Sequence, residues 1–464
     1  MIFKLKKRNE MKKINYLNLK LFYLFFAYFG ILVFWISVDH TNIYFLYSDL
    51  SKKLAIHTFD DFRTKVRTYW PLLLLIVGIV SFFLSVEIIK QLKKNKVVLF
   101  FLLYVLSCIV GLFTSSNWLE LSINNMYLLH LNSSVYLICY LFFIQFITKN
   151  KFEENIFYSF IFLILALLTY ILLNTTFSYG ETTTLTKTYT IFLNSNGISR
   201  YVVILQIFFL SLYFFNDNLN EFYKKLLVPV IILTYFMIFI FESRMNSVII
   251  TILSFLFIYF RNSKNIKKEF LKNIFNLLLA FFAYTVFVFY FYPQNATYKE
   301  SRLKYSINQF LSPSKIDNKY SLNKNEANST NIRFNTWRLL AKEGSKNIIF
   351  GSGDHSDRFF LKKNKTLNTG GEAGNSIVYV FFSAGIFGVI FFLLFYFFLA
   401  RQLYLNIQMI KNEKIKINFK ICFSIMTIIY FITRSVVEVS FATWGIDAII
   451  MFFSISLLKK TKLT

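Results

Sequence analysis

The apolar run NSIVYVFFSAGIFGVIFFLLFYFFLA (residues 375–400) shows most clearly how this chain folds. It contains no charged residue, and as a helix it is long enough to cross about 30 Å of hydrocarbon. Similar runs recur along the whole sequence, of which 56% is hydrophobic and 20% aromatic. A water-soluble domain could not bury so much apolar surface. The sequence therefore predicts an all-α, polytopic membrane protein.

Apolar runs bounded by charged residues predict about twelve transmembrane helices. These predicted spans lie at 21–38, 71–89, 97–113, 133–148, 155–173, 194–215, 225–242, 246–260, 273–292, 375–400, 417–434 and 440–457. The first run follows a basic flank and has no small-residue cleavage site after it, so we expect a retained span. The chain then divides into residues 1–292 with nine spans, a long connection at 293–374, and residues 375–464 with three spans and a tail.

Lysine and arginine gather in alternate short connections between the spans. By the positive-inside rule, both termini are expected in the cytoplasm and the intervening connections outside. The connection at 293–374 falls outside by parity, and long loops escape the charge rule. The net charge of +27 comes mainly from these connections, where basic side chains contact anionic lipid headgroups. Membrane lipids, and no nucleic acid, are therefore the expected partners of the basic residues.

The large external loop is predicted to contain two amphipathic helices. The first lies at 299–311, and a polar linker at 312–330 separates it from the second helix at 330–350. Gly344 is placed to end that second helix. The apolar face predicted for it consists of Phe334, Trp337, Leu340 and Ala341. A glycine-rich return, GSGDHSDRFFLKKNKTLNTGGEAGNS (residues 351–376), then leads into the next span.

Five arginines are expected near the external face, either in the loop or at the ends of spans. Ionisable groups at membrane depth are costly and usually face a cavity or a partner. Guanidinium groups bind phosphate oxygens in a bidentate manner, so such a group suits a lipid-linked phosphate or diphosphate. Arg434 and Glu438 have the i, i+4 spacing that can pair them on a helix. The five are Arg200, Arg244, Arg333, Arg338 and Arg434.

The order of short motifs over roughly residues 190–400 resembles that of the O-antigen ligase and O-antigen polymerase superfamily. The motifs are NSNG before a span, SR after the seventh span, RFNTW and GSG in the long loop, and GNSIVYVFFSAGIFG opening the tenth span. The resemblance implies a helical membrane fold of the type C glycosyltransferase class. It also implies transfer of glycan from polyprenyl diphosphate at the outer face of a bacterial cytoplasmic membrane. A repeat-unit flippase and a chain-length regulator would be the accompanying partners.

Several residues match the motifs of that superfamily. Arg244 corresponds to an arginine expected to bind the donor phosphate, and Arg333 opens an R-x10-G pattern that ends at Gly344. The glycine pairs that match are Gly351 with Gly353 in the loop and Gly385 with Gly388 in the following span.

One position departs from the ligase pattern. Ligases of this superfamily commonly have a histidine just before the asparagine that opens the span, but here Gly374 precedes Asn375. The histidine nearest to it is His355, far earlier in the loop. This departure favours a repeat-unit polymerase over a ligase.

Glycosyl transfer from a diphosphate also needs a base for the acceptor hydroxyl. The candidates in the return segment are Asp354, His355 and Glu372, although each is equally compatible with a solvated loop position. The sequence contains no D-x-D pair and no His/Asp cluster, so we expect a metal-independent reaction without a cofactor.

Three other functions stay open alongside the polymerase. A ligase would transfer the glycan to a lipid or another acceptor. A type C transferase using a polyprenyl-monophosphate sugar would rely on acidic residues in the first external loop, where Asp39, Asp60 and Asp61 lie. A flippase or secondary transporter suits the number of spans, but the sequence shows no clear inverted repeat.

Overall fold

The structure, a computed structural model, describes residues 95–115, 161, 165, 195–240, 243–261, 266–291, 329–354, 356–363, 373–412, 417–442 and 446–459. Across these residues all regular secondary structure is helical, which confirms the all-α class. The helices are α4 (Lys96–Thr114), α8 (Ser195–Phe215), α9 (Glu221–Ile240), α10 (Arg244–Arg261), α11 (Ile266–Phe291), α14 (Ser329–Gly344), α15 (Ser356–Lys363), α16 (Ser376–Lys411), α17 (Phe419–Arg434) and α18 (Ile446–Lys459). Two short 3-10 turns are η4 (Ser345–Asn347) and η6 (Ser440–Ala442).

The helices agree well with the predicted spans wherever the two can be compared. Helices α4, α8, α9, α10, α11, α16, α17 and α18 coincide with predicted spans to within a few residues at most ends. The prediction for α16 was too short, because this helix continues from Ser376 to Lys411. The predicted spans 21–38, 71–89 and 133–148 and the loop helix 299–311 lie outside the described residues, as does nearly all of 155–173 and of the linker 312–330.

Within the described part of the chain, four helices are long and apolar enough to cross a membrane. They are Lys96–Thr114, Glu221–Phe239, Ile266–Val286 and Ser376–Lys411. Helix α11 carries an exposed apolar stripe at Leu271, Phe275, Leu278 and Phe282, each more than 60% exposed. Such a stripe is costly in water but normal where a helix faces lipid tails. These features together describe a membrane-embedded protein.

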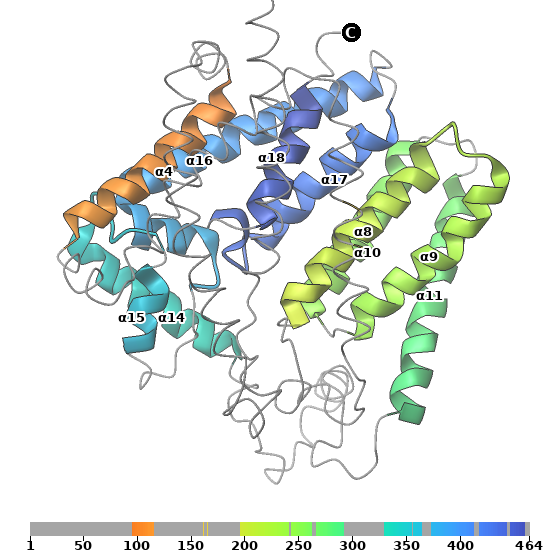
Figure 1. Cartoon of the computed structure of the whole chain (residues 1–464), viewed down its shortest axis with the longest axis horizontal. Helices are drawn as coiled ribbons and strands as arrows, with labels where there is room; N and C mark the ends of the chain where they lie inside the picture. Colours follow the sequence, from red (N-terminus) through yellow and green to blue (C-terminus); the bar gives the residue numbers. More distant parts are fainter. Residues whose placement is uncertain are drawn as a thin grey trace, which may run out of the picture.

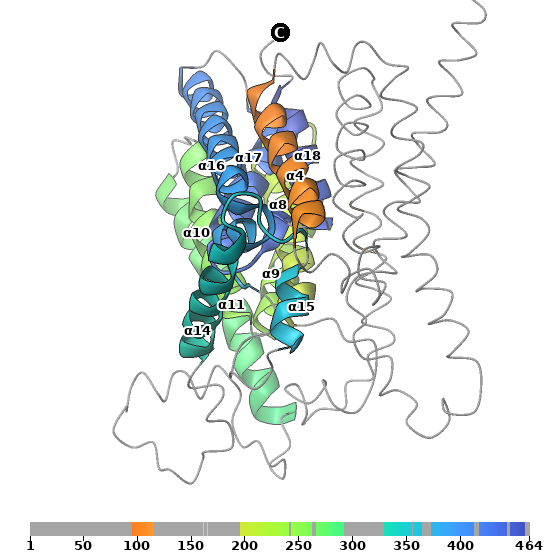
Figure 2. The same ribbon diagram turned by 90° about the vertical axis from the view of Figure 1, so that its left-hand side faces the viewer.

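The helices form two groups that meet at α17. Figure 1 shows α4 and α16 crossing side by side on one flank and α8, α9, α10 and α11 on the other, with α17 and α18 between them. Helices α14 and α15 lie below α4 and α16 in Figure 1 and also in Figure 2, which is turned by 90°. Aromatic side chains fill the contact between α4, α16 and α18. The ring of Phe101 lies 5.2 Å from that of Phe395 and 4.5 Å from that of Phe452.

Helix α16 is broken at Gly385, and the break is filled by the inserted segment, residues 348–353. Gly385 has φ 64° and ψ −162°, which lies outside the helical region. The amide of Ile386 donates to the carbonyl of Ile348, and the amides of Ser352 and Gly353 donate to the carbonyls of Phe382 and Ser383. The hydrogen bonds that the break would leave unmade inside α16 are thus replaced by bonds to the inserted segment.

The glycines around this break allow backbone to approach backbone. A Cβ atom on Gly351 would lie 2.5 Å from the amide nitrogen of Ala384, and one on Gly385 would lie 2.4 Å from the carbonyl oxygen of Ile349. On α4, a Cβ on Gly111 would lie 2.1 Å from the carbonyl oxygen of Phe350. Gly351 and Gly353 also have positive φ, of 72° and 94°. The close approach at these glycines is therefore between α4, the inserted segment and α16.

Helix α14 ends at Gly344 as predicted, but the reason for the glycine is different. Gly344 has an ordinary helical φ of −60°, so it is not a left-handed cap. A Cβ there would lie 3.0 Å from the ring of Phe381 on α16. The predicted apolar face was also partly wrong, because Phe334 is 57% exposed while Thr336 is buried beside Leu340. The face that packs against α16 is thus rotated toward Thr336, Leu340 and Gly344.

Asn375 caps the start of α16 and links it by a hydrogen bond to the turn that follows α17. Its side-chain oxygen accepts from the amides of Ile377 and Val378, and its side-chain nitrogen donates to the carbonyl of Val436 at 2.7 Å. We expect Asn375→Ala to lower the free energy of unfolding by about 1–2 kcal/mol, because it removes both the cap and the link. Thermal unfolding in detergent would measure this change. The exposed Asn335→Ala on α14 serves as control and should change the stability by less than about 0.5 kcal/mol.

Candidate functional site at the loop-side helix ends

Five helix ends meet on the side of the molecule from which the large loop leaves. Asn246, near the start of α10, donates to Ser199 at the start of α8 over 2.6 Å. It also accepts from the hydroxyl of Tyr430 on α17 over 2.9 Å. The amide of Ser376, at the start of α16, donates to the carbonyl of Ser435, just beyond α17. The start of α18 joins them through Asp447, so residues from distant parts of the sequence share one region.

Four charged side chains form a network at this meeting point. Asp447 Oδ2 accepts from Arg434 Nη1 at 2.6 Å and from Arg200 Nη1 at 3.2 Å. Arg434 also donates through Nη2 to Glu438 Oε2, which confirms the predicted pairing of these two residues. The pairing joins the last residue of α17 to the turn that follows the helix. The charge network therefore links α8, α17 and α18 through a single carboxylate oxygen.

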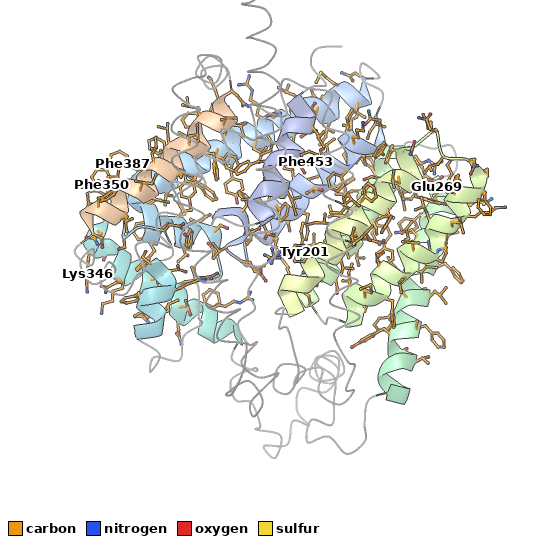
Figure 3. All side chains as sticks on the ribbon, in the orientation of Figure 1. Tyr201, Glu269, Lys346, Phe350, Phe387 and Phe453 are labelled. Atoms are coloured by element: carbon orange, nitrogen blue, oxygen red, sulfur yellow. The ribbon has the colours of Figure 1, made fainter. Side chains whose placement is uncertain are left out.

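The members of the network differ in how far they are buried. The side chains of Arg434 and Asp447 are each only 3% exposed, while Glu438 is 19% and Arg200 is 21% exposed. Tyr201, which is fully buried, accepts a hydrogen bond from Arg200 Nη2 at 3.2 Å. Figure 3 labels Tyr201 in the middle of the molecule, at the junction of the two helix groups. The two guanidinium groups and two carboxylates compensate one another, as buried charges require.

The other predicted arginines take different positions. Arg244 is the first residue of α10, two positions before Asn246, and so belongs to the same junction of helix ends. Arg333 and Arg338 lie on α14, which packs against α16, and both side chains are exposed. The structure thus brings Arg200 and Arg434 into contact through Asp447 and puts Arg244 at the start of a neighbouring helix. Arg333 and Arg338 belong to the loop helix below.

Of the three predicted candidates for a base, only Asp354 is described. It lies between the inserted segment and α15 and is 4% exposed, so it is not a solvated loop charge. His355 and Glu372 lie outside the described residues. The neighbouring Asp357, which the sequence did not single out, is 1% exposed and accepts from the amide of Ala373 at 2.9 Å. Trp337 of α14 donates to the carbonyl of the same Ala373, which ties the return segment to the loop helix.

Gly374, where the ligase pattern has a histidine, has φ of 61°. Glycine adopts this left-handed conformation freely, whereas residues with a side chain seldom do. The departure from the ligase pattern therefore coincides with a backbone conformation that favours glycine.

Two members of the site were missed by the sequence analysis, Asp447 and Asn246. Asp447 is an acidic residue inside the apolar run 440–457, and an ionisable residue within a predicted span is itself a signal of a functional or paired position. Asn246 stands at the start of the run 246–260, where nothing in the local sequence distinguishes it from a helix cap.

No protein-family model matches this chain, and no curated protein sequence matches it. What the site can do follows from its residues. In a membrane-embedded protein, arginines at the loop-side helix ends can bind an anionic headgroup, because guanidinium groups donate in parallel to phosphate oxygens. Within the described residues there is no group of three or more His, Cys, Asp or Glu side chains arranged to hold a metal ion.

Proposed function

We propose that this protein polymerises the repeat units of a surface polysaccharide, either O-antigen or capsule, by glycosyl transfer at the outer face of the bacterial cytoplasmic membrane. The donor is an oligosaccharide linked to polyprenyl diphosphate. The observation that supports this proposal most is the gathering of Arg200, Arg244 and Arg434 at helix ends on the side of the large loop. The ordered motifs of the O-antigen superfamily lie in the same part of the chain and add to it.

In the proposed reaction, the hydroxyl oxygen of the acceptor sugar forms a bond to the anomeric carbon of the donor glycan. The bond from that carbon to the diphosphate oxygen breaks, and the hydroxyl proton passes to a base. Negative charge develops on the leaving diphosphate, and prearranged arginines stabilise it. Arg244 and the exposed loop arginines Arg333 and Arg338 are the proposed diphosphate ligands, together with Arg200. The proposed bases are Asp354, His355 and Glu372.

The test is polymerisation by the purified full-length protein, given a polyprenyl-diphosphate-linked repeat unit in lipid nanodiscs. We expect a ladder of products with increasing numbers of repeat units. Arg244→Ala and Arg333→Ala should each reduce the rate about 100-fold, because each removes a group that stabilises the developing charge. The control is Arg401→Ala, which changes an exposed arginine in the second half of α16 and should leave the rate unchanged.

Two results would contradict different parts of this proposal. A ladder of normal rate and length from both arginine variants would exclude a role for these arginines in binding diphosphate. Transfer of a single glycan to a lipid acceptor, without chain growth, would instead identify a ligase. Cells lacking the gene distinguish the same two functions, since loss of a polymerase leaves single repeat units on the surface and loss of a ligase leaves full-length polymer on the carrier lipid.

A further inference from the structure

The two arginines that share Asp447 are not equivalent. Arg434 is 3% exposed, and its two terminal nitrogens are both engaged, Nη1 with Asp447 and Nη2 with Glu438. Arg200 is 21% exposed and, among the residues that the structure describes, makes one ion pair, to the same oxygen of Asp447. Its other terminal nitrogen donates to Tyr201. Of the two arginines, Arg200 is therefore the accessible one, and Arg434 lies in the closed interior of the network.

The contact between Arg200 and Asp447 is also the part of the network with unused hydrogen-bonding capacity. Asp447 Oδ1 and Arg200 Nε are buried, and among the described residues neither has a hydrogen-bond partner. Buried polar atoms are nearly always hydrogen-bonded in folded proteins, so such exceptions often mark functional positions. Here both atoms, the acceptor Oδ1 and the donor Nε, belong to the ion pair between Asp447 and Arg200.

The surroundings hold Arg200 in one orientation. Its guanidinium carbon lies 5.0 Å from the centre of the Tyr201 ring, and Tyr201 is fully buried in α8. Asp447 is fixed in turn by Arg434, at 2.6 Å, the shorter of its two arginine contacts. A long arginine side chain loses much rotamer freedom when it binds a ligand, so fixing it beforehand lowers that cost.

We propose that Asp447 is a positioning residue, which holds Arg200 so that it binds the diphosphate of the lipid-linked donor. Arg434 and Glu438 secure Asp447 and do not contact the substrate. This assignment rests on the proposed function, because it takes the ligand of Arg200 to be the donor diphosphate. It gives the two arginines that share Asp447 different roles, since Arg200 binds the ligand and Arg434 supports Asp447.

The experiment measures binding of polyprenyl diphosphate to the full-length protein in lipid nanodiscs, with polyprenol as the probe that lacks the anion. Asp447→Asn should weaken binding of polyprenyl diphosphate about tenfold, because a misoriented Arg200 loses a charge-assisted hydrogen bond. Binding of polyprenol should stay unchanged. Asp447→Glu, which keeps the charge, should recover most of the affinity for the diphosphate. Arg401→Gln removes a positive charge from an exposed position of α16. It is the control for Arg200→Gln in the cycle below, and it should leave both affinities unchanged.

A double-mutant cycle separates positioning from a general effect on the fold. If Asp447 acts through Arg200, the variant carrying both Arg200→Gln and Asp447→Asn should bind polyprenyl diphosphate no more weakly than Arg200→Gln alone. Additive losses would overturn the positioning role. So would equal losses of affinity for both probes, which would indicate a structural defect.

The outcomes also distinguish this inference from the function on which it rests. If the unchanged protein binds polyprenyl diphosphate no better than polyprenol, both the proposed function and the role of Asp447 are overturned. If the unchanged protein prefers the diphosphate and Asp447→Asn prefers it equally, only the positioning role is overturned.

Discussion

Gly385→Ala is expected to prevent the inserted segment from docking in the break of α16. The φ and ψ of Gly385 lie in a region that is essentially restricted to glycine, and an alanine Cβ would lie 2.4 Å from the carbonyl oxygen of Ile349. The backbone strain and the overpacking together should cost about 2–6 kcal/mol. That is a large part of the stability of a typical domain. The measurement is the yield of monodisperse protein after detergent extraction, together with its unfolding temperature.

The control for this prediction is Ile386→Ala, one position further along the same helix. Ile386 is 45% exposed, and its amide, which an alanine keeps, makes the hydrogen bond to Ile348. We expect this variant to fold with nearly the original yield. Equal yields from Gly385→Ala and Ile386→Ala would show that the segment does not need the glycine conformation.

Arg434→Met is expected to destabilise the protein by about 3–5 kcal/mol, since it leaves two carboxylates without their shared partner. Asp447 is 3% exposed, and Arg200 alone would then compensate its charge across the longer contact of 3.2 Å. Methionine keeps an apolar stem of similar length, so the loss reports the charge rather than a cavity. Unfolding by heat or denaturant in detergent micelles would measure it.

Two further variants test the cause of that loss. Arg434→Met combined with Glu438→Gln should recover part of the stability, because one uncompensated carboxylate is removed. Lys346→Met breaks a surface pair in which Lys346 and Glu343 are 68% and 27% exposed, and it should cost no more than about 1 kcal/mol. Equal effects of Arg434→Met and Lys346→Met would contradict the importance of the buried network.

The positions of the described apolar helices could be predicted from sequence, because the bilayer sets a length for each apolar run. The break in α16 could not. Gly385 lies inside an apolar run that is compatible with one continuous helix, and its conformation depends on residues 348–353, which approach it only in the folded protein. The glycines of the return segment were singled out only because they match the motifs of the O-antigen superfamily. The close approach that they permit is to α4 and α16, which local sequence does not reveal.

The candidate site was predicted in part. Alternation of charged connections put Arg200, Arg244 and Arg434 at one face, and the structure brings all three to the loop-side helix ends. The carboxylate that joins two of them was missed, because Arg200 and Asp447 are 247 residues apart and no local pattern reports so distant a pairing. Arg434 and Glu438 were recognised as a pair because they are only four residues apart.

The threading of residues 348–353 between α4 and α16 has a consequence for biosynthesis. Cys108 of α4 and Ser383 of α16 lie in contact, with Sγ and Oγ 3.9 Å apart, yet they are separated by 275 residues. At a synthesis rate of about 5–20 residues per second, α4 therefore spends on the order of ten to sixty seconds in the membrane before its partner is made. Helix α4 has no charged residue after Lys96 at its start, so its apolar sequence tolerates that interval in lipid. The pairing of α4 with α16 therefore waits until the last third of the chain has been synthesised.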